Sequence, residues 1–202
     1  MSDPHLPDVS RETTEKLKAL VALVEKWTIK INLISKASIS EIWERHIVDS
    51  MQLFHLGKGG KHWVDLGSGG GFPGLVIAIL ADELDPEMSI TLLESDQRKC
   101  AFLRTAIREL ELPATVVCQR IEAAEPLNAD VLSARALADL TSLLEFAVLH
   151  LAPGGVAIFP KGKSWQIEDA AAHSRWSYRL EAIRSRTNPE AAILKIKDIV
   201  RV

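Results

Sequence analysis

The sequence of 202 residues contains no apolar stretch of the roughly 18 residues that a membrane-spanning helix needs, which excludes an ordinary integral membrane protein. Its N-terminus also lacks a basic segment followed by an apolar one, so we expect no signal peptide. Both absences favour a cytoplasmic protein without a membrane partner.

Cysteine is scarce as well, since Cys100 and Cys118 stand alone, without a CxxC pair or a histidine at metal-ligand spacing. This excludes a disulfide framework and predicts no metal site. Two isolated cysteines in a cytosolic chain are expected to be reduced, buried thiols.

The sequence also has no excess of positive charge, since its net charge is −3. That balance argues against a uniformly basic nucleic-acid-binding protein, but it hides an asymmetry. Residues 161–202 contain nine Lys and Arg against five Asp and Glu, whereas residues 1–160 contain fifteen against twenty-two. The C-terminal part is suited to contact phosphates, although a solvated charged surface would have the same composition.

The most informative stretch that is present covers residues 63–74. A short apolar run ends in Asp65-Leu66, a glycine-rich loop follows, and a helical apolar pattern begins after it. Glycine allows a positive φ and lets a ligand approach the main chain, while the helix start offers free N–H groups. The stretch therefore predicts a strand, a tight turn and a helix that together hold a cofactor.

The chain around this stretch predicts three regions: a flexible tail over 1–9, an N-terminal helical cap over 10–60, and a Rossmann-like domain over 61–202. Ser10 is suited to cap a first helix that Asn32 ends. The S-x-x-E spacing of Ser38 and Glu41 predicts a second helix, whose apolar face includes Trp43 and His46.

From residue 62 onward, strand and helix patterns alternate, which indicates a mostly parallel sheet. The predicted helices cover 73–82, 97–111, 138–150 and 165–174, and the predicted strands cover 62–66, 89–94, 114–119, 129–134 and 155–160. Two further strands, 177–184 and 191–197, have no helix between them and predict an antiparallel hairpin. A seven-stranded α/β sheet that ends in such a hairpin resembles the Rossmann-like class I methyltransferases, which use S-adenosylmethionine.

The glycine spacing is G-x-G-x-G rather than the G-x-G-x-x-G of dinucleotide-binding proteins. Glu94 ends the second strand, where a carboxylate can accept hydrogen bonds from ribose hydroxyls. Asp65 is placed to receive a cofactor ammonium group, and Ile121 and Glu122 to contact an adenine. Each has a purely structural alternative, as a loop cap, an exposed acid or an ordinary loop.

At the ends of the later strands lie Arg135, in a Ser-Ala-Arg-Ala sequence, and Lys161. An arginine between alanines is hard to explain as packing, so we expect it to contact the cofactor, a substrate phosphate or an internal acid.

Six motifs together closely resemble the bacterial RsmG (GidB) family, which methylates N7 of one guanine in the 16S RNA of the small ribosomal subunit. They cover residues 32–33, 45–50, 65–74, 120–122, 133–136 and 161–162. The resemblance runs from about residue 15 to the C-terminus. The R-H-x-x-D-S motif at 45–50, combined with the glycine loop, is much more specific than the glycine loop alone. It implies an S-adenosylmethionine cofactor and 16S ribosomal RNA or the small subunit as partner. The sequence leaves the oligomeric state open, and a monomer is the default expectation.

With the resemblance, the expected cofactor-binding residues are Asp65, Gly67, Ser68, Gly69, Gly71, Phe72, Glu94, Ser95, Ile121, Glu122 and Arg135. Guanine N7 has an in-plane lone pair and needs no general base, so we expect residues that position the substrate and no proton-transfer residue. The positioning candidates are Arg45, His46, Arg120 and Lys161, of which His46 is the one most easily explained as structural. Two alternatives stay open: a nicotinamide-dependent oxidoreductase, and a non-catalytic cofactor-binding protein with an RNA or regulatory role.

Overall fold

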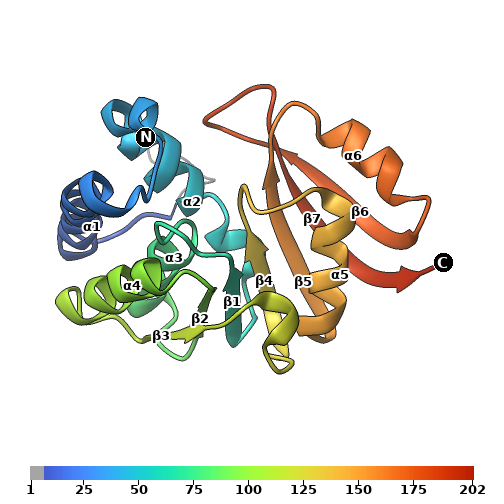
Figure 1. Cartoon of the computed structure of the whole chain (residues 1–202), viewed down its shortest axis with the longest axis horizontal. Helices are drawn as coiled ribbons and strands as arrows, with labels where there is room; N and C mark the ends of the chain where they lie inside the picture. The colour runs from blue at the N-terminus through green and yellow to red at the C-terminus, as the bar shows by residue number, and fades with distance from the viewer. Residues whose placement is uncertain (1–6) are drawn as a thin grey trace.

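The computed structural model describes residues 7–202 and is built around one seven-stranded sheet (Figure 1). The strand order is β3-β2-β1-β4-β5-β7-β6. The strands are β1 (His62–Leu66), β2 (Ser89–Glu94), β3 (Ala114–Cys118), β4 (Ala129–Ala134), β5 (Leu151–Lys161), β6 (Trp176–Arg184) and β7 (Ala192–Arg201).

Strands β1 to β5 are parallel, and β7 lies between β5 and β6, antiparallel to both. This confirms the predicted α/β class with a mostly parallel sheet and a closing hairpin. Because β6 runs in the same direction as β5, the turn from β6 to β7 lies at the edge of the sheet where the parallel strands end. That edge is where ligands bind in open α/β sheets.

The helices cover the two faces of the sheet, and each face has its own apolar cluster. One cluster includes Leu20, Ile77 and Phe102, which are fully buried; the other includes Leu144 and Phe159. Figure 1 shows α4 beside β2 and β3, with α1 packed next to α4, and α5 and α6 on the side of β5 to β7. The longer helices are α1 (Arg11–Ile31), α3 (Gly74–Leu84), α4 (Gln97–Glu109), α5 (Leu140–His150) and α6 (Trp165–Ala172).

The first helix begins and ends where the sequence predicts. The Ser10 side chain accepts a hydrogen bond from the Thr13 amide at 3.1 Å, which satisfies one of the free N–H groups of the first turn. Asn32 ends the helix in the left-handed conformation, with φ of 50°, a role that asparagine shares with glycine.

The prediction of one regular second helix is wrong. The segment consists of short turns: a 3₁₀ helix (Lys36–Glu41), a π-helix (Trp43–Val48), α2 (Asp49–Met51) and a second 3₁₀ helix (Phe54–Gly57). The Ser38 hydroxyl bonds to Ser35, and Glu41 pairs with Arg45, so no capping box forms. Trp43, expected on the buried face, is 38% exposed.

The π-helix is a wide turn in which the Asp49 amide donates to the Glu44 carbonyl, five residues back. The Ser50 hydroxyl also bonds the His46 carbonyl at 2.5 Å, which competes with a regular helix. Such π-turns are frequent at functional sites.

Of the predicted tail, residues 1–6 lie outside the described part of the chain, Pro7 is buried and Val9 packs against the first apolar cluster. None of the helices within residues 7–202 is long and apolar enough to cross a membrane.

Candidate functional site

The loop between β1 and α3 forms a backbone cradle. Gly67, Gly69 and Gly71 have φ of 62°, 53° and 87°, values that residues with a side chain rarely adopt. The Ser68 hydroxyl donates to the Asp65 carbonyl at 2.9 Å, and the Ser68 amide donates to the Leu93 carbonyl at 3.2 Å. These bonds tie the loop to the ends of β1 and β2.

Glu94 fixes the cradle from the neighbouring strand. One carboxylate oxygen accepts from the Gly69 amide at 2.8 Å, and the other accepts from the amides of Ser95 and Asp96 at 2.7 and 2.8 Å. A carboxylate has about four acceptor positions, so one remains for a ligand hydroxyl. Glu94 therefore both holds the loop and is suited to bind a ribose.

Asp65 lies behind the cradle and is fully buried. Its oxygens accept from the Ser133 hydroxyl at 2.7 Å and from the Gly74 amide at 3.3 Å. Burial raises its pKa to about 6, although hydrogen bonds from Ser133, Ser68 and Gly74 oppose that shift. Ser133 in turn accepts from the Trp63 indole N–H at 2.9 Å, which completes a buried polar chain.

A cavity of about 340 Å³ opens beside the cradle. Ile121, at its wall, is held by His150, whose Nε2 lies 2.9 Å from the Ile121 carbonyl. Predicted cofactor residues that line the cavity are Gly67, Glu94, Ser95, Ile121 and Glu122. A cavity lined by apolar side chains and by a carboxylate with a spare acceptor position fits the adenosine part of S-adenosylmethionine. Arg120 also lines this cavity, away from the other positioning candidates.

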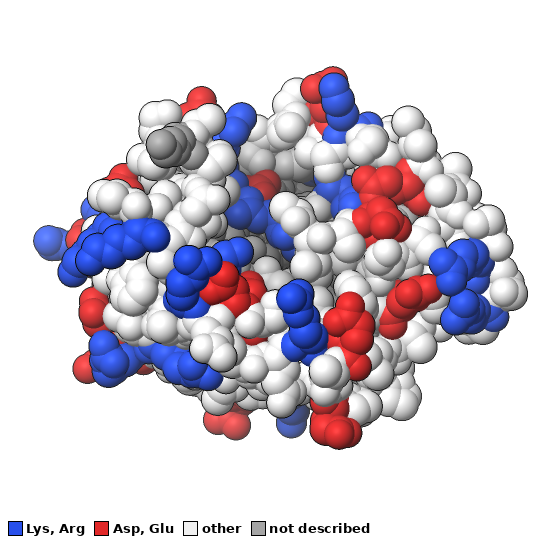
Figure 2. Space-filling model, in the orientation of Figure 1, with Lys and Arg blue, Asp and Glu red and all other residues white. Residues whose placement is uncertain are grey.

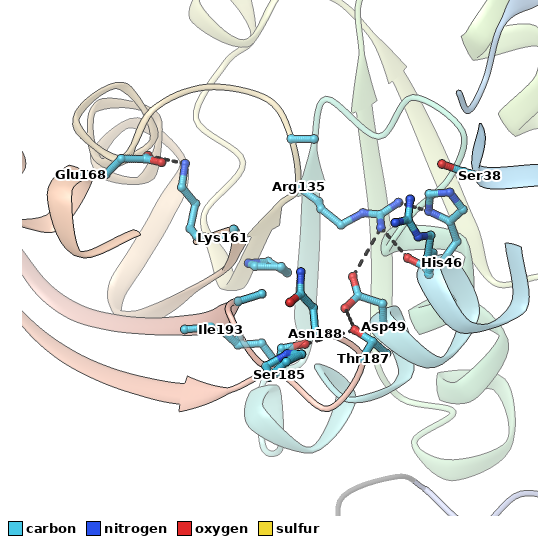
Figure 3. Close-up of a pocket in the computed structure, with 17 residues that line it drawn as sticks. Ser38, His46, Asp49, Arg135, Lys161, Glu168, Ser185, Thr187, Asn188 and Ile193 are labelled. Carbon is cyan, nitrogen blue, oxygen red and sulfur yellow. Dashed lines mark hydrogen bonds and ion pairs between the residues drawn. The ribbon is translucent and has the colours of Figure 1, made fainter. Parts of the chain in front are cut away.

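A second cavity, of about 670 Å³, lies between the N-terminal turns and the C-terminal hairpin. Ala136 lines both cavities, so the two meet at the end of β4. Arg45, Arg135 and Lys161 line the second one, and Figure 2 shows basic side chains in this hollow. Figure 3 shows Asn188, from the hairpin turn, among the side chains that line it. We call it the substrate cavity.

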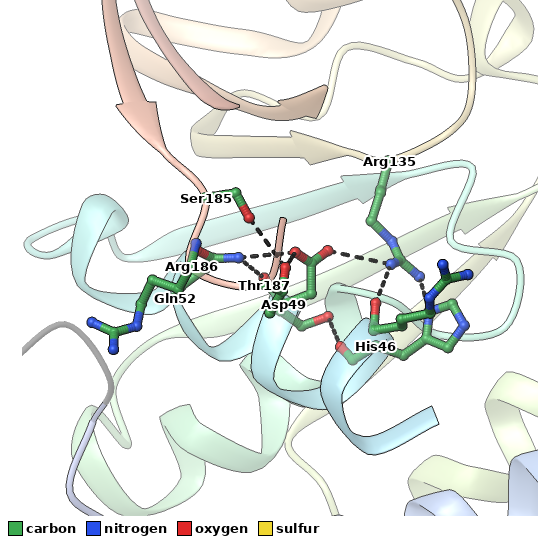
Figure 4. Close-up of polar contacts among 9 residues, drawn as sticks. His46, Asp49, Gln52, Arg135, Ser185, Arg186 and Thr187 are labelled. Atoms are coloured by element: carbon green, nitrogen blue, oxygen red, sulfur yellow. Dashed lines mark hydrogen bonds and ion pairs between the residues drawn. The ribbon is translucent and has the colours of Figure 1, made fainter. Parts of the chain in front are cut away.

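Arg135 extends from the end of β4 to the N-terminal turns (Figure 4). Its guanidinium donates to the Arg45 carbonyl at 3.0 Å and to His46 Nδ1 at 2.6 Å, and it pairs with Asp49 at 3.4 Å. It also lies over the Phe72 ring, 5.7 Å from the centroid. Arg135 therefore connects the glycine loop with the R-H-x-x-D-S motif.

Asp49 is the junction of this network. Besides Arg135, it accepts from the Thr187 hydroxyl at 2.7 Å and from the Gln52 side-chain amide at 2.9 Å. Gln52 then accepts from the Arg186 backbone amide at 3.2 Å. Asp49 and Gln52 thus hold the turn between β6 and β7 against the N-terminal segment.

His46 is a neutral member of the network. An arginine only donates, so Nδ1 accepts its hydrogen bond and the ring proton sits on Nε2. Burial, with help from Arg135 and Arg45, lowers the pKa of His46 to about 4. The ring stacks on Phe72, 4.9 Å between centroids, which places it against the glycine loop.

Lys161 is largely engaged inside the protein. Its ammonium lies 2.5 Å from Glu168 and donates to the Ala138 carbonyl at 2.9 Å. Glu168 also accepts from the Leu140 amide at 3.0 Å, at the start of α5. Lys161 therefore fixes the segment after Arg135, and one of its three N–H donors remains for a substrate.

The structure thus separates the predicted residues into three groups. Asp65, Ser68, Gly69 and Gly71 build the cradle. Gly67, Glu94, Ser95, Ile121 and Glu122 line the cavity beside it, together with Arg120. Phe72 and Arg135 lie beside Arg45 and His46, which line the substrate cavity with Lys161.

Sequence reasoning gave no role to Asp49, Gln52 or Thr187. The spacing of His46 and Asp49, three residues apart on one helical face, could have indicated a role for Asp49. No local sequence pattern indicated a role for Thr187.

Comparison with known proteins agrees with this geometry. The model of the family described as GidB, rRNA small subunit methyltransferase G, matches residues 13–190. A relative of that name from Ruegeria pomeroyi is 52% identical over 200 residues, covering 99% of this chain and 98% of its own. One from Rhodospirillum centenum is 50% identical over 192 residues, covering 95% and 87%.

Among solved structures, the 16S rRNA methylase RmtB has a TM-score of 0.56 at 16% identity, covering 95% of this chain and 76% of its own. The O-methyltransferase from Bacillus cereus has a TM-score of 0.57 at 14% identity, covering 96% and 93%. At this identity these structures share the fold alone.

Proposed function

Because the chain belongs to the GidB family of rRNA small subunit methyltransferases, we propose that it transfers a methyl group from S-adenosylmethionine to N7 of a guanine in 16S ribosomal RNA. The observation that supports this most directly is the meeting of two cavities at Ala136. One cavity offers a carboxylate and an apolar wall for a nucleoside, and the other gathers three cationic side chains.

S-adenosylmethionine supplies an electrophilic methyl group, and guanine N7 carries the lone pair that accepts it. The protein has to align the two reactants, and no residue needs to remove a proton. Glu94 and Ile121 hold the adenosine in this proposal, while Arg135 marks the boundary with the substrate cavity. The guanine becomes cationic, so Arg45 and Lys161 serve to bind guanine O6 or phosphate rather than the methylated ring.

The target base enters the substrate cavity in an unpaired or flipped state. The major groove of a regular RNA helix is too deep and narrow for side chains to reach N7. In this proposal the chain acts as a monomer in the cytoplasm, where ribosomal subunits are found. Light scattering at micromolar concentration tests the monomer.

The test is methyl transfer from labelled S-adenosylmethionine to 30S subunits that lack the modification, followed by mass mapping of the methylated nucleotide. One N7-methylguanine in 16S RNA is expected. Binding of S-adenosylmethionine without transfer would instead support a non-catalytic protein, and calorimetric binding of NAD alone would support the oxidoreductase. Naked 16S RNA and 30S subunits, compared in parallel, identify the better substrate.

A further inference from the structure

A third cavity, of about 570 Å³, lies on the other side of the turn between β6 and β7. We call it the flanking cavity. Its walls come from the N-terminal segment and from the hairpin, and they consist of Gln52, His55, Leu56, Ile183, Arg184, Ser185, Arg186, Pro189 and Ile193. No role in the methyl transfer described above involves this cavity.

The chemistry of the flanking cavity suits a nucleotide. Leu56, Ile183 and Ile193 provide apolar surface, against which a base can lie. Arg184 and Arg186 provide positive charge at exposed positions, and no acidic residue is among the described residues that line it. Arg184 is exposed at the rim of the cavity, so its charge can reach a phosphate there.

The two cavities are neighbours, separated by the hairpin turn. Ser185, Pro189 and Ile193 line both of them. The turn is held in place by the hydrogen bonds from Thr187 to Asp49 and from the Arg186 amide to Gln52. An RNA strand that places one base in the substrate cavity therefore brings its next nucleotide to the flanking cavity, on the other side of this turn.

Building on the proposed function, we propose that the flanking cavity binds the nucleotide adjacent to the target guanine in the same RNA strand. Turning a base out of its stack separates it from its neighbour, and the neighbour then needs a surface of its own. The apolar floor receives that base, and Arg184 receives the phosphate. The hairpin turn serves as the wedge between the two nucleotides.

Two variants test this proposal by independent routes. Arg184→Glu reverses a charge at the rim, and Leu56→Trp fills the floor. Each is expected to raise the KM for 16S RNA by roughly fivefold to tenfold, as loss of one phosphate or base contact does, and to leave the Kd for S-adenosylmethionine unchanged. Lys197→Glu is the matched control, because Lys197 is exposed on the same hairpin and lies outside this cavity. Its KM is expected to stay within twofold of wild type.

Cross-linking of the wild-type protein gives a readout that no variant's folding affects. A 16S RNA fragment carries 4-thiouridine at either neighbour of the methylated guanine. Cross-links to peptides within 52–56 or 183–189 support the proposal. Cross-links confined to other segments, or an unchanged KM in both folded variants, overturn it. If the wild-type protein methylates neither 30S subunits nor naked 16S RNA, the proposed function itself fails, so the two failures are distinguishable.

Discussion

The cofactor side and the substrate side of the site are built in different ways. On the cofactor side, backbone amides from the loops that follow two adjacent strands, β1 and β2, converge on one carboxylate, Glu94. On the substrate side, the side chains of Arg135 and Thr187, from two distant segments, converge with nearby Gln52 on Asp49. The first arrangement is rigid because it is part of the sheet edge. The second depends on how the N-terminal segment and the hairpin pack together, so we expect it to respond to RNA.

The largest expected difference between the two sides comes from a substitution at Gly69, on the cofactor side. Gly69→Val puts a β-branched residue at φ of 53°, where only the Gly67 carbonyl lies near a new Cβ, at 3.6 Å. The left-handed conformation costs about 1–2 kcal/mol and the side chain points into open space at the cradle, so affinity for S-adenosylmethionine should fall about a hundredfold. Calorimetry measures it.

Gly59→Val controls for backbone strain, because Gly59 also has a positive φ, 93°, with open space around it and no part in the cradle. It should lose stability like Gly69→Val and bind S-adenosylmethionine normally. Equal affinity losses in both variants would contradict the cradle.

The second test removes the charge of Glu94. In Glu94→Gln an amide NH₂ faces backbone donors that the carboxylate now satisfies, so affinity for S-adenosylmethionine should fall about tenfold and stability by about 1–3 kcal/mol. Calorimetry and urea unfolding measure the two effects. Glu87→Gln, an exposed glutamate before the same strand, is the control and should change neither.

The third test addresses the substrate side. Asp49→Asn leaves Arg135 without its carboxylate partner, so the methylation rate on 30S subunits should fall about fivefold, with a smaller change in cofactor affinity. Thr187→Val removes one hydrogen bond to the same carboxylate and should have a smaller effect. If Asp49→Asn weakened cofactor binding as strongly as Glu94→Gln, the two sides would not be separable.

The smallest expected effect is a pH dependence from His46. Its folded-state pKa is about 4 and its usual value is 6.5, so between these values the unfolded chain binds more protons. This shift therefore stabilises the fold above pH 6.5, and its contribution is lost as the pH falls toward 4.

Urea unfolding of the wild type and His46→Asn across this range measures the difference between their slopes. Asp65, whose pKa is raised to about 6, contributes the opposite slope but is present in both proteins. Parallel stability curves for the two proteins would contradict the lowered pKa of His46.

Features of the fold and site that depend on neighbours in sequence were predictable. The Ser10 cap and the glycine loop followed from local patterns, and the end of β2 placed Glu94 beside that loop because adjacent parallel strands end side by side. Helix and strand patterns of ordinary length also predicted the sheet and its closing hairpin.

The rest depends on contacts between distant residues. Residues 49 and 187 are 138 positions apart, and the bond between Arg135 and Asp49 spans 86 positions. The π-turn around His46 leaves the regular helical period, so the apolar spacing there suggested a helix that the structure does not contain. Lys161 was expected to position the substrate. Its pairing with Glu168 depends on how the chain turns from β5 into α6, which the local sequence does not reveal.

The buried chain from Trp63 through Ser133 to Asp65 has a practical use. One hydroxyl accepts the indole N–H and donates to the carboxylate, and that carboxylate also holds Gly74 at the start of α3. Any change in the protonation of Asp65 or the position of the loop therefore alters the magnetic environment of a single indole proton. In a chain with five tryptophans, the Trp63 indole resonance is a built-in spectroscopic reporter of the cradle, readable without a label at the site.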